Sequence, residues 1–208
     1  MLHSKVLLGL LAFLGLSTSL KAQDYTLSTN VPSLLLGNIN IEPSMRLSSN
    51  LSLQLGISAR PKSFDLPAPT GLIHWIYNGH HTGFNNRMSW GTVKHVEHFS
   101  FAPSLRLWHK GVYNRGMFLG IHGLGMVYRY GSDSKDFNYS QGLLVGGGLS
   151  VGYSHELTPH WNLEAEGGIS GAWTKYDLHG QNGALKQADK SRLLVLPSRL
   201  ALRLVYVF

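Results

Sequence analysis

The segment Ser198–Phe208 constrains the fold more than any other part of the chain. Its residues alternate between two faces, and one face is apolar and ends in aromatic residues: Leu200, Leu202, Leu204, Tyr206 and Phe208. The other face carries Arg199 and Arg203. A strand that is apolar outside, polar inside and aromatic at its last residue is what a bacterial outer-membrane barrel needs for recognition and closure. We therefore interpret Leu204, Tyr206 and Phe208 as a barrel-assembly signal.

The first residues are typical of a secretory signal peptide. Lys5 supplies positive charge, Val6–Leu16 is an apolar stretch of eleven residues, and Ala22 is a small residue at the expected cleavage site. The stretch is shorter than the ~20 apolar residues of a spanning helix. We expect residues 1–22 to be a signal peptide, residues 23–208 to be a single β-barrel domain, and the location to be the bacterial outer membrane.

The composition of the chain limits the kinds of site and partner that it can have. The chain has no cysteine, which excludes disulfides, thiolate metal sites and a cysteine-linked lipid anchor. Without Lys5 and Lys21, 16 of the 18 Lys and Arg remain against 11 acidic residues, a net charge of about +5. The basic residues are scattered, which fits anionic lipid headgroups or internal ion pairs better than nucleic acid. We expect outer-membrane lipid as a partner and no nucleic acid, and we assign no cofactor and no metal site.

Eight segments of about ten alternating residues are candidate strands. They are Asn30–Leu36, Ile39–Leu47, Leu51–Arg60, His98–Trp108, Gly116–Tyr130, Gln141–His155, Trp161–Thr174 and Arg192–Phe208. The first is the weakest, because Pro32 and the run Leu34–Leu36 break its alternation.

The connections between these segments favour one architecture. Short turns alternate with longer loops over residues 61–97, 130–139 and 175–191, and outer-membrane barrels place short turns in the periplasm and long loops outside. We predict an eight-stranded antiparallel up-and-down transmembrane β-barrel of the outer-membrane type with a filled polar lumen. A soluble lipocalin-like barrel is the alternative, but it requires the apolar face to point inward.

Several runs resemble an uncharacterised family of small Gram-negative outer-membrane β-barrels, catalogued as a domain of unknown function. The runs are Lys94–His98, Arg106–Trp108, Gly116–His122 and His160–Ala165, together with the opening from Thr29–Asn30 to Asn38–Glu42. The resemblance implies a barrel fold and an envelope location, and it implies a fimbrial association because genes of this family often lie near those for fimbrial subunits. Members often carry cysteines after the equivalent of Trp108 and in the last outer loop, and this chain has none.

Charged residues fall on the face that we assign to the lumen. An eight-stranded barrel is just wide enough for side chains to fill it, so charges inside must pair with one another or with water. We predict a lumen ion-pair network of Glu42, Arg46, Arg60, Arg106, Glu164, Glu166, Arg199 and Arg203. A catalytic pair of Glu164 and Glu166 is the alternative, but carboxylates opposite several arginines are neutralised rather than poised for proton transfer.

The long loop is rich in aromatic residues and histidines. We predict that it contacts a partner through Trp75, Tyr77, Phe84 and Trp90, because loops on rigid scaffolds are where binding usually occurs. A metal site is an alternative for its histidines: His74, His80, His81, His95 and His98. Interfacial packing explains them better, since adjacent histidines on a strand point to opposite faces. We interpret His122 as a hydrogen-bonded wall residue.

These observations favour a non-enzymatic envelope protein with a structural or docking role. Its expected partner is a surface or envelope protein, such as a fimbrial assembly. The alternative is a lipid A-modifying enzyme of the small-barrel type, in which Ser89, His95 or His98, and Glu97 would form a catalytic set. Catalytic triads are recognised by geometry rather than by sequence position, so a Ser, a His and a carboxylate in hydrogen-bond reach would favour the enzyme.

Overall fold

The computed structural model describes residues 24–60, 66–68, 91–109, 112–131, 139–180 and 183–208, with the backbone alone for 66–68 and 91–95. The expected signal peptide, residues 1–22, lies outside these ranges and remains a prediction.

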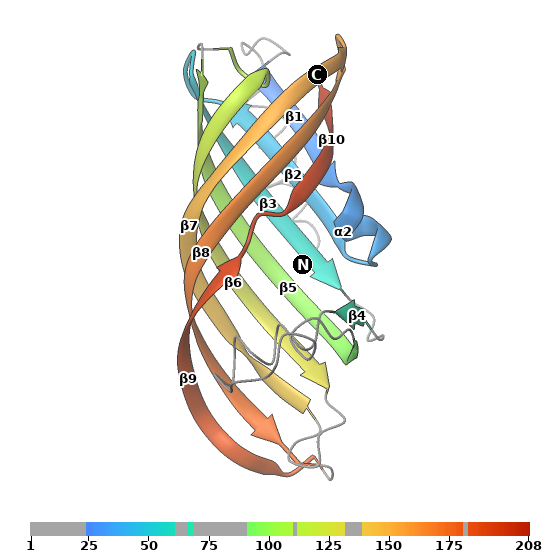
Figure 1. Ribbon diagram of the computed structural model, residues 1–208, viewed down its shortest axis with the longest axis vertical. Coiled ribbons are helices and arrows are strands. Elements are labelled where there is room, and N and C mark those ends of the chain that lie inside the picture. Colours follow the sequence, from blue (N-terminus) through green and yellow to red (C-terminus); the bar gives the residue numbers. More distant parts are fainter. Residues whose placement is uncertain (1–23, 61–65, 69–90, 110–111, 132–138, 181–182) are drawn as a thin grey trace, which may run out of the picture.

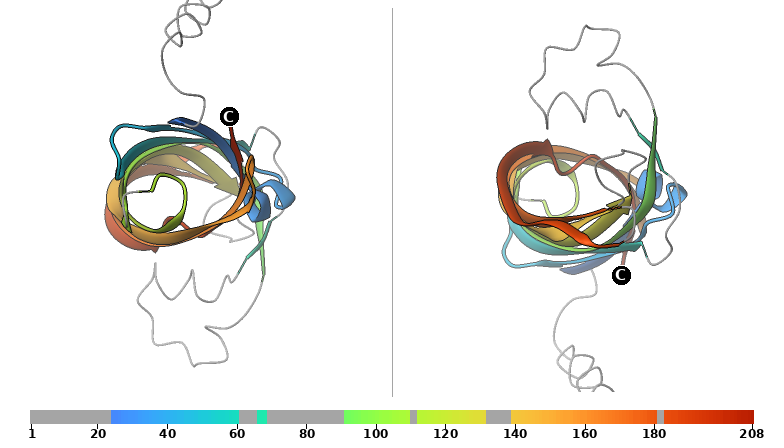
Figure 2. Two further views of the ribbon diagram at one scale, coloured as in Figure 1. Left: turned by 90° about the horizontal axis from the view of Figure 1, so that it is seen from above. Right: turned by 90° about the horizontal axis from the view of Figure 1, so that it is seen from below.

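Eight strands close into an antiparallel barrel (Figure 1, Figure 2). They are β1 (Tyr25–Asn30), β2 (Ile39–Arg46), β3 (Leu51–Arg60), β5 (Gly91–Trp108), β6 (Gly116–Gly131), β7 (Tyr139–Thr158), β8 (Trp161–His179) and a last strand in two pieces, β9 (Leu185–Pro197) and β10 (Ala201–Val207). Strand β10 pairs with β8 on one side and with β1 on the other, which closes the ring. A short strand, β4 (Leu66–Ala68), pairs with the start of β5 outside the ring. The predicted closed eight-stranded antiparallel β-barrel is confirmed.

The alternation of the strands decides which side chains face outward. In β6, Leu119 and Ile121 are exposed whereas their neighbours Phe118 and His122 are buried in the barrel. In β3 the inward positions hold Ser52 and Gln54, which are also buried. The wall is therefore apolar outside and largely polar inside, the reverse of a water-soluble barrel.

The first strand differs from the prediction. Residues Asn30–Leu36 do not form a strand, because the chain leaves the sheet after Asn30 and Val31–Leu35 is a short helix, α2, with a proline in its first turn. Proline suits a helix start and cannot donate to a ladder, which explains the change. The first strand is instead β1, whose only large apolar residue apart from Tyr25 is Leu27. No helix among the described residues is long and apolar enough to cross a membrane.

Two of the expected loops are shorter than predicted because the ladders extend into them. Strand β5 begins at Gly91, inside the expected loop 61–97. Residues 175–191 were expected as a loop, yet β8 continues to His179 and β9 begins at Leu185, so most of this segment is a paired hairpin. Residues 185–192 on the β9 side are exposed on both faces, and residues 176–179 of β8 are all half-buried, so neither side shows the alternation that marks a strand with one buried face.

A bulge separates β9 from β10. Ile169 of β8 pairs with Pro197, and Glu166 pairs with Ala201, so three steps along β8 match four along the last strand. The extra residue falls in Ser198–Leu200, which we call the strand break. One extra residue in a strand bends it and changes which side chains point inward. Even-numbered residues such as Leu194 face the interior in β9, and odd-numbered residues such as Arg203 do so in β10.

The turn between β5 and β6 folds back into the end of the barrel where β1 begins and β10 ends (Figure 2, left). Tyr113 Oη lies 3.2 Å from both Thr26 Oγ1 and Ser44 Oγ, so the turn contacts β1 and β2. On the other side, Asn162 Nδ2 donates to the carbonyl of Asn114 over 2.6 Å. Burial raises the pKa of Tyr113 above its ordinary value, which keeps the phenol neutral in this contact. The turn therefore fills this end of the lumen.

The interior is apolar toward the opposite end, which the sequence analysis did not predict. The buried side chains there are Leu144, Ala172 and Leu194, and the half-buried ones packed on them are Leu124, Met126, Tyr128 and Leu196. All of them come from β6, β7, β8 and β9. The barrel interior thus has a polar section and, beyond it, an apolar one.

Candidate functional site

The polar section is built around Arg203 of β10. Its Nε atom donates to Glu42 Oε2 over 2.9 Å, and its Nη1 atom donates to Glu164 Oε1 over 3.0 Å and to Glu166 Oε2 over 2.5 Å. Arg203 therefore joins β10 to β2 on one side and to β8 on the other. One guanidinium in the middle of three carboxylates removes most of their mutual repulsion.

Two further arginines complete this group, the lumen cluster of Glu42, Arg106, Glu164, Glu166, Arg199 and Arg203. Arg106 from β5 donates to Glu164 over 3.1 Å and to Glu166 over 2.6 Å. Arg199 reaches Glu42 over 3.4 Å. Three positive charges thus face three negative ones, and all six side chains are buried. Carboxylates held by this many donors are poor proton-transfer groups.

The structure brings together six of the eight residues of the predicted network, and Arg46 and Arg60 lie apart. Arg46 is the last residue of β2, where its side chain is exposed and pairs with Asp24 over 3.3 Å. Alternation predicts which face of the sheet a residue lies on, but not how far along the barrel axis it lies. Arg46, at the end of a strand, was therefore wrongly assigned to the interior. Arg60 is buried at the end of β3, and its Nε donates over 2.8 Å to Asn38 Oδ1 beside α2. Its second bond goes to the carbonyl of Leu36.

Gln54 also belongs with the lumen cluster. The alternation of β3 predicts its inward position, although as an uncharged residue it was not part of the predicted ion-pair network. Its Oε1 atom accepts a hydrogen bond from Arg199 over 3.2 Å, and the side chain is buried.

A cluster of His122, Ser170 and Ser198 lies beside the strand break. His122 Nε2 is 2.8 Å from the hydroxyl oxygen of each serine, and the two hydroxyls are 2.7 Å apart. The other ring nitrogen, Nδ1, is buried and has no hydrogen-bond partner among the described residues. A serine triad needs a group that orients that nitrogen. The contact is a serine–histidine pair without its third member.

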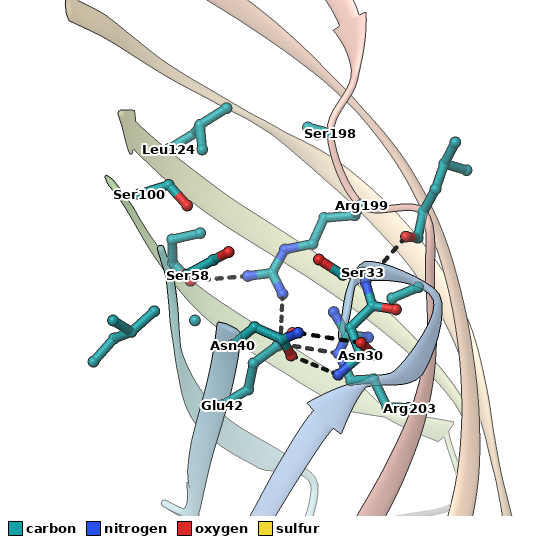
Figure 3. Close-up of a pocket in the computed structure, with 15 residues that line it drawn as sticks. Asn30, Ser33, Asn40, Glu42, Ser58, Ser100, Leu124, Ser198, Arg199 and Arg203 are labelled. Atoms are coloured by element: carbon teal, nitrogen blue, oxygen red, sulfur yellow. Dashed lines mark hydrogen bonds and ion pairs between the residues drawn. The ribbon is translucent and has the colours of Figure 1, made fainter. Parts of the chain in front are cut away.

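A cavity of about 130 Å³ opens in the wall at the strand break, and we call it the wall cavity. Its lining comes from the ends of β1 and β2, from β3, β5, β6 and α2, and from the break itself. Figure 3 shows Arg199 extending across it from the strand break toward Glu42. Arg199 Nη2 donates over 2.9 Å to the carbonyl of Ala102 on β5. The wall cavity therefore lies between the lumen cluster and the outside of the barrel.

The predicted loop contacts cannot be placed. Trp75, Tyr77, Phe84 and Trp90 lie outside the described residues, as do His74, His80, His81 and Ser89, and the side chain of His95 is not described either. His98 is described, and its Nε2 lies 3.4 Å from Ser58 Oγ on β3. Within the described ranges, no group of three or more His, Cys, Asp or Glu is arranged to hold a metal ion.

The comparisons with known proteins give a family. The model of a family described as protein of unknown function (DUF3575) matches residues 8–208. The chain belongs to DUF3575. It matches no curated protein and no solved structure. Membership agrees with the family resemblance in the sequence, and it assigns no role, since DUF3575 is itself of unknown function.

In this DUF3575 chain the aromatic end of β10 packs on the start of β8. Tyr206 contacts Trp161 edge-on, with ring centroids 5.0 Å apart, and contacts Phe208 at 5.2 Å. It also stacks on His160 at 6.0 Å. These rings lie at the end of the barrel where the β7–β8 turn closes. The role of Leu204, Tyr206 and Phe208 in assembly stays a prediction.

Proposed function

We propose that this protein is a non-enzymatic outer-membrane barrel that serves as a structural or docking element of the cell envelope. The observation that carries the proposal is the inverted distribution of side chains across the wall. Ile121, on the outer face, is 67% exposed, whereas Arg203, on the inner face, is 1% exposed. Large aliphatic side chains occupy the outer face of β5, β6, β7 and β8 in the same way. A surface of this kind is stable in a bilayer and aggregates in water.

The filled interior supports a structural role rather than transport. The lumen cluster crosses the polar section, the turn with Tyr113 and Asn114 fills one end, and the apolar residues around Leu144 pack together beyond. Aqueous channels occur in barrels with about twice as many strands. We infer that neither water nor solute passes along the axis.

The docking role is supported by how far the ladders extend. Strands β5 to β9 continue past the ends of β2 and β3 at the lower end of Figure 1, and β4 adds to β5 there. A rigid ladder of this kind can present loops to another protein. We propose the segment Gly71–Trp90 as the contact, and a surface or fimbrial protein as the partner. The fimbrial link follows from the family resemblance alone.

An arginine scan along the outer face of β6 tests the membrane placement. In a bilayer, arginine at Ile121, near the middle of the strand, should cost about 2–4 kcal/mol, and the cost should fall to about 0–1 kcal/mol toward Met117 at the strand end. The measurement is reversible urea unfolding in phospholipid vesicles. If arginine costs the same small amount at every outward position, the outer face does not meet hydrocarbon and the membrane placement is wrong.

Co-purification tests the docking role. The protein is extracted from its native membrane in mild detergent, and its companions are identified by mass spectrometry. A partner that is retained by the intact protein and lost on deletion of residues 71–90 supports docking. An equal set of companions with and without the segment contradicts it.

The second candidate is a lipid-modifying enzyme, and one contact favours it. Ser198 lines the wall cavity and lies 2.8 Å from His122 Nε2, as a nucleophile lies from its base. Mass spectrometry of lipid A and phospholipids from cells with the wild-type protein and with Ser198→Ala decides between the candidates. Trimmed lipids that appear with the wild type and vanish with Ser198→Ala would support the enzyme over the structural role.

A further inference from the structure

The wall cavity lies where the hydrogen-bonded ladder between neighbouring strands of the wall is interrupted. Strand β1 pairs with β10 only from Thr26 to Asn30, after which the chain turns away into α2. At the same height the last strand breaks, and Asn30 Nδ2 donates to the carbonyl of Leu200 over 3.3 Å. Beyond that point, β9 pairs with β8 alone among the described strands. The ladder of the barrel wall is therefore interrupted beside the cavity.

The lining favours an anionic group. It carries the guanidinium groups of Arg199 and Arg203 and the carboxylate of Glu42. Arg203 is already paired with three carboxylates, so the attraction for an anion comes from Arg199. Hydroxyl and amide side chains add hydrogen-bond donors around them: Ser33, Ser58, Ser100, Ser198, Asn30 and Asn40. An oxyanion is the group that takes several such donors at once.

One donor in this lining is unused. The Nε atom of Arg199 is buried and has no hydrogen-bond partner among the described residues, although the side chain is only 5% exposed. The Arg199–Glu42 contact, at 3.4 Å, is also longer than each of the contacts that Arg203 makes with Glu42, Glu164 and Glu166. A buried donor left without an acceptor is costly, so an acceptor oxygen from a ligand would stabilise this position. Figure 3 shows the guanidinium of Arg199 within the cavity.

The size of the cavity and its surroundings limit the rest of the ligand. A volume of about 130 Å³ is close to the ~150 Å³ of a cavity that holds one small molecule, so it accepts a headgroup rather than a whole acyl chain. Outside it the surface is apolar: Leu200 is 70% exposed, and Leu35 of α2 and Ile39 of β2 are also exposed. Helix α2 contacts both β10 and β2, so this apolar surface is continuous across the mouth.

We propose that the wall cavity binds the carboxylate of a single-chain fatty acid, with the hydrocarbon chain lying outside against the apolar surface around Leu200 and α2. Arg199 Nε and the lining hydroxyls hold the carboxylate. The binding gives the lumen cluster a fourth negative partner and closes the opening that the strand break leaves in the wall. The proposal rests on the membrane placement proposed above for the source of the ligand, but the binding itself is measured in detergent solution.

The test uses the full mature chain, refolded in a non-ionic detergent, and palmitate labelled with ¹³C at the carboxyl carbon. The carboxyl resonance should shift saturably as protein is added, because the environment of the carboxylate changes beside Arg199. Ser100→Leu fills the cavity without removing a charged group and should weaken binding by at least about tenfold, roughly the effect of a lost buried contact. Ser191→Leu makes the same change on the exposed surface of β9 and should bind as the wild type does.

Folding and ligand source are controlled separately. Each variant must show the heat-dependent shift in gel mobility of a folded barrel, and Arg199→Lys provides a second variant that keeps the charge but loses the Nε donor. Acetate at a hundredfold excess should leave palmitate bound, since acetate has no hydrocarbon chain to contribute to its affinity. No saturable shift with the wild type, equal binding by Ser100→Leu, or displacement by acetate would each overturn the proposal. Failure of the arginine scan in β6 with palmitate still bound would refute the membrane placement alone.

Discussion

Arg203 and Glu42 meet across the closing strand of the barrel. The Nε–Oε2 distance is 2.9 Å, yet Arg203 lies on β10 and Glu42 on β2, with β1 between them. β1 contributes only five pairs to the closing ladder with β10. The Arg203–Glu42 contact therefore reinforces, from inside the lumen, the ring that the β1–β10 ladder closes. It joins segments that are 161 residues apart.

Replacing Arg203 by methionine should destabilise the barrel strongly. Three buried carboxylates would lose their shared cation, and breaking a buried pair from one side costs about 3–5 kcal/mol. Arg115→Met is the matched control, because Arg115 pairs with Glu156 at 2.6 Å on the exposed surface, where such pairs contribute about 0–1 kcal/mol. Urea unfolding in vesicles measures both. Equal losses would show that the lumen cluster contributes no more than a surface pair.

The protein should not conduct ions. The lumen cluster and the inward turn leave no continuous aqueous path in the described part of the barrel, since Trp108, Phe118 and Arg106 are all buried across the same section. Reconstitution in a planar bilayer checks this, with a general porin in the same apparatus as the control. Stable, discrete current steps that scale with the amount of the protein would contradict the sealed interior.

Close contact between β7 and β8 should make any side chain at Gly148 destabilising. A Cβ atom on Gly148 would lie 2.7 Å from the Cα atom of Ser170 and would press on the carbonyl oxygen of Ile169. Because backbone cannot move aside as a side chain can, Gly148→Ala should cost about 1–3 kcal/mol. Gly171 on the outer face of β8 has nothing within 4 Å of the corresponding position. Gly171→Ala should be neutral or stabilise by up to ~1 kcal/mol in the same unfolding measurement.

Alternation made most of the wall predictable. Strands such as β3 have one apolar and one polar face throughout, so both their bounds and their orientation followed from a period of two. The first strand was misplaced because Tyr25–Asn30 carries little apolar signal: its inward positions are Thr26 and Ser28. In a barrel with a polar interior, a strand needs few apolar residues, and β1 has the fewest.

The site was harder to predict than the wall. The six members of the lumen cluster could be predicted because charged side chains on the inward face of a narrow barrel must meet. Placing Arg46 correctly also required its position along the barrel axis, which alternation does not give. The apolar section was hidden because Leu143 and Leu144 are both apolar, which conceals that Leu144 points inward. The wall cavity depends on a bulge, and a single extra residue between two apolar segments leaves no signal in the alternation.

Two single-residue deletions separate the bulge from the rest of the last strand. Deleting Ser198 removes the extra residue, so Leu196 and Arg199 become two apart, as regular alternation requires. The variant should fold, with a continuous strand in place of the break and with palmitate binding lost.

Deleting Leu202 should destabilise the barrel more than deleting Ser198. It also removes the extra residue between Leu196 and Arg203, so both can face inward, but it turns Arg199 to the outer face and takes its hydrogen bonds from Glu42 and Gln54. Gel mobility with and without heating reads out both variants, since a folded barrel migrates differently until it is boiled. If both deletions fold equally well, inward placement of Arg199 is not required for closure. If both fail, the extra residue at the break is itself needed for assembly, because regular alternation alone cannot complete the last strand.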